Sequence, residues 1–152
     1  MALSLTDIAR KVPIEIWDHD FCKKWYDGWH DINIENWSIT KNSIKLCKGL
    51  DKEKLVSVAK HEIWHQVHEA YLTQEQRKQW EDLHKQSKST VDHLRTYSSQ
   101  SALEDFADIY ASSYSKTKPL RSNLFDKKLE MINSFKPTLK PQYNLFDFSN
   151  IK

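Results

Sequence analysis

The chain has 152 residues, the length of one domain, and a domain of this size buries enough apolar surface to fold without disulfides or metal ions as staples. Its formal net charge is +2 and 29% of its residues are charged, which argues against a strongly basic nucleic-acid-binding protein. We therefore expect a single domain over residues 1–152 and no nucleic acid among its partners.

The sequence shows no targeting or membrane-spanning segment. Residues 1–12 contain charged side chains and no continuous apolar core, and no apolar run approaches the roughly 20 residues of a membrane helix. Cys22 and Cys47 form no Cys-x-x-Cys pair and are too few for a secreted disulfide framework, so we expect reduced thiols. These features predict a cytoplasmic protein that does not bind membranes. Export without a signal peptide, or incorporation into a larger particle, stays open.

The N-terminal third predicts a small sheet of antiparallel type. Residues 12–17 partly alternate apolar and polar side chains, as a half-buried strand does. Aromatic residues recur four apart over residues 20–29, which indicates a short helix. Alternation returns over residues 32–40 and 43–47, which predicts a hairpin with its turn at residues 40–42.

The rest of the chain predicts helices. Apolar residues recur at steps of three and four over residues 51–72 without Pro or Gly, and Asp51 is a good N-cap. Three more helices are expected, over residues 74–86, from residue 101 or 102 onward, and over residues 120–135. The first of them follows a capping box at residues 73–76. We expect residues 87–99 to form a polar surface connection and residues 137–152 to form an extended tail that docks on the domain. A small sheet followed by helices is an α+β fold.

The long helix contains His61-Glu62-Ile63-Trp64-His65, a His-Glu-x-x-His motif. Residues four apart lie one above the other on a helix, so both imidazoles can reach one cation. Glu62 lies about a hundred degrees round the axis from His61 and can reach a water bound to that cation. Two imidazoles with a nearby carboxylate suit a catalytic zinc, which needs a third protein ligand. The alternative is an ordinary helix with two histidines on its solvent-exposed face.

Glu104 is the candidate for the third ligand. A Glu on a helix that packs across the motif helix would complete a His₂Glu site. On local grounds, Glu104 fits equally well as the last residue of a capping box that begins at Ser101. His93, His84 and Asp92 stay open as alternative ligands.

A second motif, Glu104-Asp105-Phe106-Ala107-Asp108, is preceded by Tyr97 seven residues before its Glu. With these residues the chain resembles the lethal-factor and Pro-Pro endopeptidase type of gluzincin metallopeptidases over residues 60–110. In that family the ligand Glu opens a Glu-x-Phe-Ala-Glu-like segment, and a Tyr seven residues earlier points into the active site. The resemblance implies a zincin-like domain with the motif helix at its centre and one Zn²⁺ per chain.

The resemblance also implies a function, that of a zinc-dependent peptidase acting on a peptide or protein substrate. Residues 35–40 would offer a strand edge to an extended peptide. The alternative is a catalytically inactive binding or structural module on the same fold, within a protein assembly, for which the six Trp and six Tyr would form a protein interface. The site residues that the resemblance implies are three zinc ligands (His61, His65 and Glu104), two catalytic residues (Glu62 as general base and Tyr97 as hydrogen-bond donor) and Asp108, which would accept the outer N–H of a zinc-bound histidine.

Overall fold

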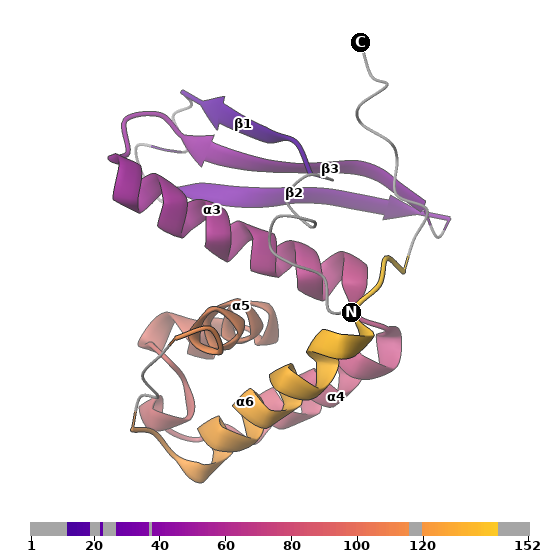
Figure 1. Ribbon diagram of the computed structural model, residues 1–152, viewed down its shortest axis with the longest axis vertical. Helices are drawn as coiled ribbons and strands as arrows, with labels where there is room; N and C mark the ends of the chain where they lie inside the picture. Colours follow the sequence, from indigo (N-terminus) through magenta and orange to yellow (C-terminus); the bar gives the residue numbers. More distant parts are fainter. Residues whose placement is uncertain (1–11, 19–21, 23–26, 37, 116–119, 143–152) are drawn as a thin grey trace.

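The computed structural model describes residues 12–18, 22, 27–36, 38–115 and 120–142. A small sheet lies along one side of the molecule and the helices lie along the other (Figure 1). This arrangement confirms the expected α+β fold class.

Within the described residues, the sheet has three strands in the order β1-β3-β2. β3 (Ser38–Cys47) is central, with β1 (Ile14–Trp17) parallel to it and β2 (Gly28–Glu35) antiparallel to it. The expectation of an antiparallel sheet is therefore wrong for β1. Alternation within one strand does not report the direction of its neighbour, so the sequence carried no signal for this pairing.

The hairpin between β2 and β3 turns earlier than the sequence predicts. Asn36 has a φ of 49°, in the left-handed region that Asn tolerates better than most residues, and it follows the last pair of the ladder, Glu35 with Ser38. Residues 40–42, the expected turn, lie inside β3. The expected peptide-binding edge over residues 35–40 is divided between the end of β2 and the start of β3, which pair with each other. Within the described residues, β1 pairs only with residues 44–47 of β3, so binding of a peptide at this edge stays a prediction.

The cysteines form a disulfide, with the Cα atoms of Cys22 and Cys47 5.5 Å apart. The expected reduced thiols are therefore wrong. Sequence spacing did not reveal the bond because its partners lie 25 residues apart and meet only in the fold. The short helix expected over residues 20–29 lies almost entirely outside the described residues, and Gly28 and Trp29 at its end belong to β2.

α3 (Lys52–Gln66) lies against the sheet and carries the His-Glu-x-x-His motif (Figure 1). The expected N-cap is confirmed, because the Asp51 side chain accepts a hydrogen bond from Lys54 N at 2.8 Å. The last turn widens into a π-helix, η1 (Val67–Tyr71), so the expected helical run is present with a different final geometry. The last five residues of α3, Glu62 to Gln66, are buried, which fixes most of the motif inside the fold.

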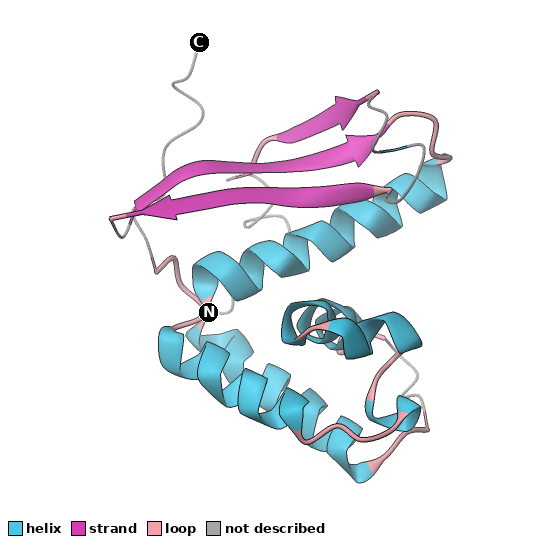
Figure 2. Ribbon diagram, turned by 180° about the vertical axis from the view of Figure 1, so that it is seen from behind, coloured by secondary structure: helices cyan, strands magenta, loops and turns pink. Residues whose placement is uncertain are grey.

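α5 (Ala102–Ser112) packs on the face of α3 that is turned away from the sheet, and α4 (Gln74–Lys85) and α6 (Asn123–Phe135) pack against α5 (Figures 1 and 2). Trp80, Phe106 and Phe125, one from each of these three helices, are fully buried. The bounds of the three helices are close to those expected, and the segments beside them form short 3₁₀ turns, η2 (Thr90–Asp92), η3 (Thr96–Gln100) and η4 (Lys136–Thr138).

Two connecting segments are packed more closely than a surface loop. In the connection over residues 87–99, Asp92, His93 and Ser98 are buried, so the expected surface position is wrong for them. The tail docks as expected in its described part, because Leu139 is buried and Gln142 N donates to Ala70 O at 2.9 Å. Residues 143–152 lie outside the described residues. None of the helices that the structure describes has the length and apolarity needed to cross a bilayer.

Candidate metal centre

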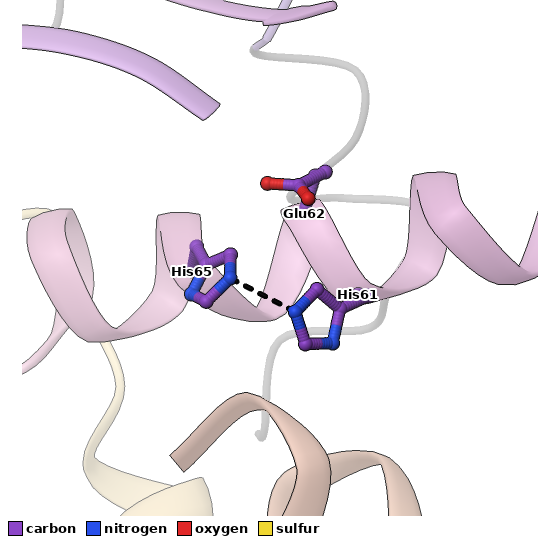
Figure 3. Close-up of side chains that lie close together, drawn as sticks. All are labelled: His61, Glu62 and His65. Carbon is purple, nitrogen blue, oxygen red and sulfur yellow. Dashed lines mark hydrogen bonds between the residues drawn. The ribbon is translucent and has the colours of Figure 1, made fainter. Parts of the chain in front are cut away.

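His61, His65 and Glu104 meet where α3 packs against α5. His61 Nε2 lies 2.9 Å from Glu104 Oε2 and 3.0 Å from His65 Nε2, and His65 Nε2 lies 3.4 Å from Glu104 Oε1. Figure 3 shows the two imidazoles close together along α3, with Glu62 on another side of the helix. The structure therefore brings together the three residues that the sequence proposed as ligands.

The spacing of these atoms suits a zinc ion. A tetrahedral shell with nitrogen and oxygen ligands at about 2.0–2.1 Å places neighbouring donors about 3.3 Å apart, and the three separations here are 2.9, 3.0 and 3.4 Å. Two neutral imidazole nitrogens that face each other with their lone pairs repel, so a proton or a cation must lie between His61 and His65. One cation bound by both would remove this repulsion and leave a fourth coordination position open.

The capping-box interpretation of Glu104 is half correct. Ser101 caps α5, because its hydroxyl oxygen accepts a hydrogen bond from Glu104 N at 3.1 Å. The Glu104 carboxylate does not return the bond to the Ser101 backbone but contacts the two histidines instead. The backbone and the side chain of one residue thus serve the two roles that the sequence left open.

Asp108 lies on the other side of the His61 ring, with its Oδ1 3.3 Å from His61 Nδ1. Its carboxylate also accepts hydrogen bonds from Arg95 Nε at 2.7 Å, from Arg95 Nη2 at 3.0 Å and from the Ser98 hydroxyl. A histidine that carries its proton on Nδ1 and donates it to a carboxylate has Nε2 free for a metal. Asp108 is therefore placed where the sequence expected it, and Arg95 and Ser98 are partners that the sequence did not suggest.

The charges around His61 and Glu104 are strongly coupled. Burial alone would lower the pKa of His61, but hydrogen bonds to Asp108 and Glu104 outweigh it and raise this pKa to about 9. Burial alone would raise the pKa of Glu104, but the two histidines outweigh it and lower this pKa to about 2. The metal-free pair is therefore a protonated imidazole beside a carboxylate, and a metal has to displace the proton of that imidazole.

A cleft of about 1120 Å³ opens beside these residues. Its walls are β2, α3, η3 and α5, and four aromatic side chains face it, Trp29, Trp64, Tyr97 and Tyr114. Glu62 also lines it, and burial raises the pKa of the Glu62 carboxyl in spite of the nearby histidines. One Glu62 oxygen and one nitrogen each of His61 and His65 all lie within 4.8 Å of one another. Tyr97 and Glu62 are thus in the cleft where the sequence placed them.

The alternative third ligands have other partners. His84 Nδ1 and His93 Nδ1 lie 2.7 and 3.1 Å from the Asp105 carboxylate, and the Asp92 carboxylate accepts hydrogen bonds from Ser122 and from the backbone of residues 88 and 89. None of the three alternative residues lines the cleft. Of the four candidates, Glu104 alone accompanies the motif histidines.

Comparison with known protein families decides the family of the chain. The model of the LTXXQ motif family matches residues 59–148, more than half of the 152 residues. The chain belongs to the LTXXQ motif family. The letters of that name are found here at Leu72-Thr73-Gln74-Glu75-Gln76. No curated protein and no solved structure matches the chain.

Membership of the LTXXQ motif family corrects the resemblance to gluzincin metallopeptidases. The match covers all of the region, residues 60–110, on which that resemblance depended, and the family is not a peptidase family. The expectation of a zinc-dependent peptidase, with its hydrolase activity, is therefore wrong. The match does not contradict the alternative of a non-catalytic binding module. The error has a physical source, because the two motifs specify donor atoms for a cation and not the chemistry done beside it. The catalytic roles expected of Glu62 and Tyr97 depended on peptidase activity and are withdrawn with it.

The LTXXQ motif itself forms the start of α4. Thr73 Oγ1 accepts a hydrogen bond from Gln76 N at 3.1 Å and Gln76 Oε1 accepts one from Thr73 N at 2.9 Å, which confirms the expected capping box. Leu72 is fully buried, and Gln76 Nε2 donates to Thr138 Oγ1 at 2.8 Å. The motif therefore joins the end of the helical run that carries His61 and His65 to α4 and to the C-terminal segment.

Proposed function

We propose that this LTXXQ family protein binds one zinc ion through His61, His65 and Glu104 and holds a polypeptide segment of a partner protein in the adjoining cleft. The observation that carries the proposal is the convergence of the three donor atoms at separations of 2.9, 3.0 and 3.4 Å. Their chemistry, two imidazoles and one carboxylate, is typical of zinc. The fourth coordination position is left for a water molecule or for a side chain of the partner.

The polypeptide partner is supported by the shape and composition of the cleft. Among the strands that the structure describes, β2 pairs only with β3, so its other side can accept an extended chain through backbone hydrogen bonds. Trp29 and Tyr114, which are at least partly exposed, supply large rigid contact surfaces of the kind that are enriched at protein interfaces. An edge strand beside aromatic side chains suits a polypeptide better than a small polar ligand.

The zinc site is tested by elemental analysis. Protein purified with added zinc and then dialysed should keep close to one zinc per chain, and His65→Ala should lose it because an incomplete shell binds weakly. Lys60→Ala, beside the motif on the same helix, is the matched control and should keep its zinc. A folded wild-type protein without zinc under zinc-replete conditions would reject the site.

The partner is tested separately with a library of immobilised peptides. The zinc-loaded protein should select a subset of extended peptides, and Trp29→Ala should weaken their binding while leaving the zinc content unchanged. Equal binding of all peptides by wild type and Trp29→Ala would reject the polypeptide partner and leave the zinc site untouched.

The disulfide supports a location outside the reducing cytosol, which is the export alternative left open above. Disulfides persist in oxidising compartments and are rare in cytosolic proteins. Cys22 and Cys47 should therefore be unreactive toward thiol reagents in protein isolated without reductant from its native source. Two reactive thiols per chain in such protein would favour the cytosol.

A further inference from the structure

A second cluster of charged and polar side chains surrounds Asp105, the residue that follows the proposed zinc ligand Glu104. Asp105 is completely buried. Its carboxylate meets donors from three other segments: His84 Nδ1 of α4 at 2.7 Å, His93 Nδ1 of the connection after η2 at 3.1 Å, and Lys128 Nζ of α6 at 2.7 Å. One side chain of α5 is thus bound from three directions.

Lys128 is completely buried as well, and its ammonium group is fully bonded. It donates to Ser87 Oγ and to Asp92 O, both at 2.7 Å, in addition to Asp105. The ammonium and the carboxylate neutralise each other, so the cluster needs no further ion. Removing one partner alone would leave an uncompensated buried charge, which is strongly destabilising.

The cluster could be mistaken for a second metal site. His84, His93 and Asp105 offer donor atoms within 4.8 Å of one another. A divalent cation at that point would lie beside the Lys128 ammonium, which is bonded to the same Asp105 oxygen as His84. Like charges this close repel strongly in a buried environment. The contacts therefore fit a hydrogen-bonded anchor rather than a metal-binding group.

The anchor acts on the helical turn that carries Glu104. Successive residues on a helix point about 100° apart, so Glu104 can face α3 while Asp105 faces α4 and α6. Trp80 Nε1 of α4 donates to Ala102 O at 2.7 Å and holds the first residue of the same turn. Any rotation of α5 that moves Glu104 away from the histidines would break the bonds of Asp105.

We infer that the buried Asp105–Lys128 pair positions the metal centre, by setting the rotation of α5 that brings the Glu104 carboxylate to His61 and His65. Asp105 and Lys128 are positioning residues and bind no metal themselves. The effect of the pair on zinc affinity rests on the proposed zinc site. Its effect on the position of the Glu104 carboxylate exists with or without zinc.

The test uses a double variant, Asp105→Asn with Lys128→Met, because removing both charges leaves no unpaired buried ion. Zinc affinity, measured by competition with a chromogenic chelator, should fall about 10–100-fold, the range found when outer partners of metal ligands are removed. The visible spectrum of bound Co²⁺ should also change, because Glu104 no longer binds at its original angle. Lys85→Met with Glu81→Gln, which removes an exposed ion pair of α4, should change neither.

Two further measurements keep positioning apart from simple loss of stability and from failure of the zinc site. Ile132→Val shortens a buried side chain of α6 without touching the pair, and it should keep wild-type zinc affinity even though stability falls. A crystal structure of the metal-free double variant should show the Glu104 carboxylate moved away from His61.

A Glu104 carboxylate that stays in place would overturn the inference, whatever the zinc result. A wild type that binds no zinc, together with a displaced Glu104 in the variant, would reject the zinc function and keep the positioning role. Loss of a second zinc equivalent in the double variant would show that the cluster binds metal, and this too would overturn the inference.

Discussion

Asp108 Oδ1 lies 3.3 Å from His61 Nδ1, so that α5 contacts both nitrogens of a single imidazole. The other contact comes from Glu104, four residues earlier, whose Oε2 lies 2.9 Å from His61 Nε2. Because residues four apart share one face of a helix, a single face of α5 supplies both carboxylates. The orientation of the His61 ring therefore depends on α5 as much as on α3.

Asp108→Asn should weaken zinc binding without abolishing it. The amide carries no negative charge and is a poorer acceptor for the His61 Nδ1–H, so the ring is held less firmly and Nε2 becomes a weaker ligand. We expect an affinity about 10–100-fold lower with one zinc still bound at saturation, measured by chelator competition. Asp82→Asn, an exposed position on α4, serves as the control. Equal affinities for the two variants would contradict the role of Asp108.

Glu104→Ala should remove zinc nearly as completely as His65→Ala, because each change takes one of three ligands. His93→Ala and His84→Ala should still bind one equivalent, since their rings contact Asp105 and not the cleft. Elemental analysis of the dialysed variants separates these cases. If His93→Ala is the variant without zinc, the ligand set proposed here is incorrect.

The sequence predicted those features whose signals are local. The capping box of Thr73 and Gln76, the cap at Asp51 and the pairing of His61 with His65 all involve residues within four positions of each other. Such contacts follow from the geometry of one helix and do not depend on how helices pack. For the same reason the bounds of α4 were expected to within a residue.

Features that depend on packing were not predictable in this way. Lys128 carries no sequence signal that marks it as a buried partner of Asp105, because an isolated Lys on a helix is usually exposed. Arg95 gave no signal either, since its contact with Asp108 spans 13 residues and a polar connection. The predicted peptidase function was wrong because a set of donor atoms indicates which cation can bind but does not specify a reaction on a partner bound beside it.

The metal-free protein should lose stability between about pH 6.5 and 9. The folded pKa of His61, about 9, lies above its ordinary value of 6.5, so its contribution is complete below pH 6.5 and is lost as the pH rises through 9. The folded pKa of Glu104, about 2, lies below its ordinary value of 4.5, so its contribution is complete above pH 4.5 and is lost as the pH falls through 2. The two pKa shifts belong to one ion pair, His61 with Glu104, which stabilises the fold most between pH 4.5 and 6.5.

Urea unfolding at pH 6, 7.5 and 9 in the presence of a chelator checks this dependence. The free energy of unfolding of the wild type should fall across the series. Glu104→Gln should show a smaller fall, because a neutral amide no longer raises the pKa of His61 as much. Parallel curves for the two proteins would show that other groups cause the pH dependence.

Thr73→Ala should lower the free energy of unfolding by about 0.5–2 kcal/mol, the usual cost of removing a helix N-cap. The Thr73 hydroxyl oxygen is the acceptor for Gln76 N, and alanine leaves that backbone group without a partner at the start of α4. Thr73→Ser keeps the oxygen and should lose much less. Both variants should bind zinc with wild-type affinity, because the cap lies outside the cleft. Loss of zinc in Thr73→Ala would instead tie the LTXXQ motif to the metal centre.

Zinc should stabilise the folded protein in proportion to its free concentration. A ligand that binds only the folded state adds about 2.7 kcal/mol at a hundred times its Kd. For a chain of this length each kcal/mol raises Tm by about 2–4 °C, so we expect an increase of about 5–10 °C. Thermal unfolding followed by circular dichroism should show it, and a chelator should reverse it. Mg²⁺ at the same concentration should give no increase, since that ion prefers an octahedral set of oxygen ligands. In His65→Ala the zinc-dependent increase should vanish, and an increase that survives this change would mean that zinc binds elsewhere on the chain.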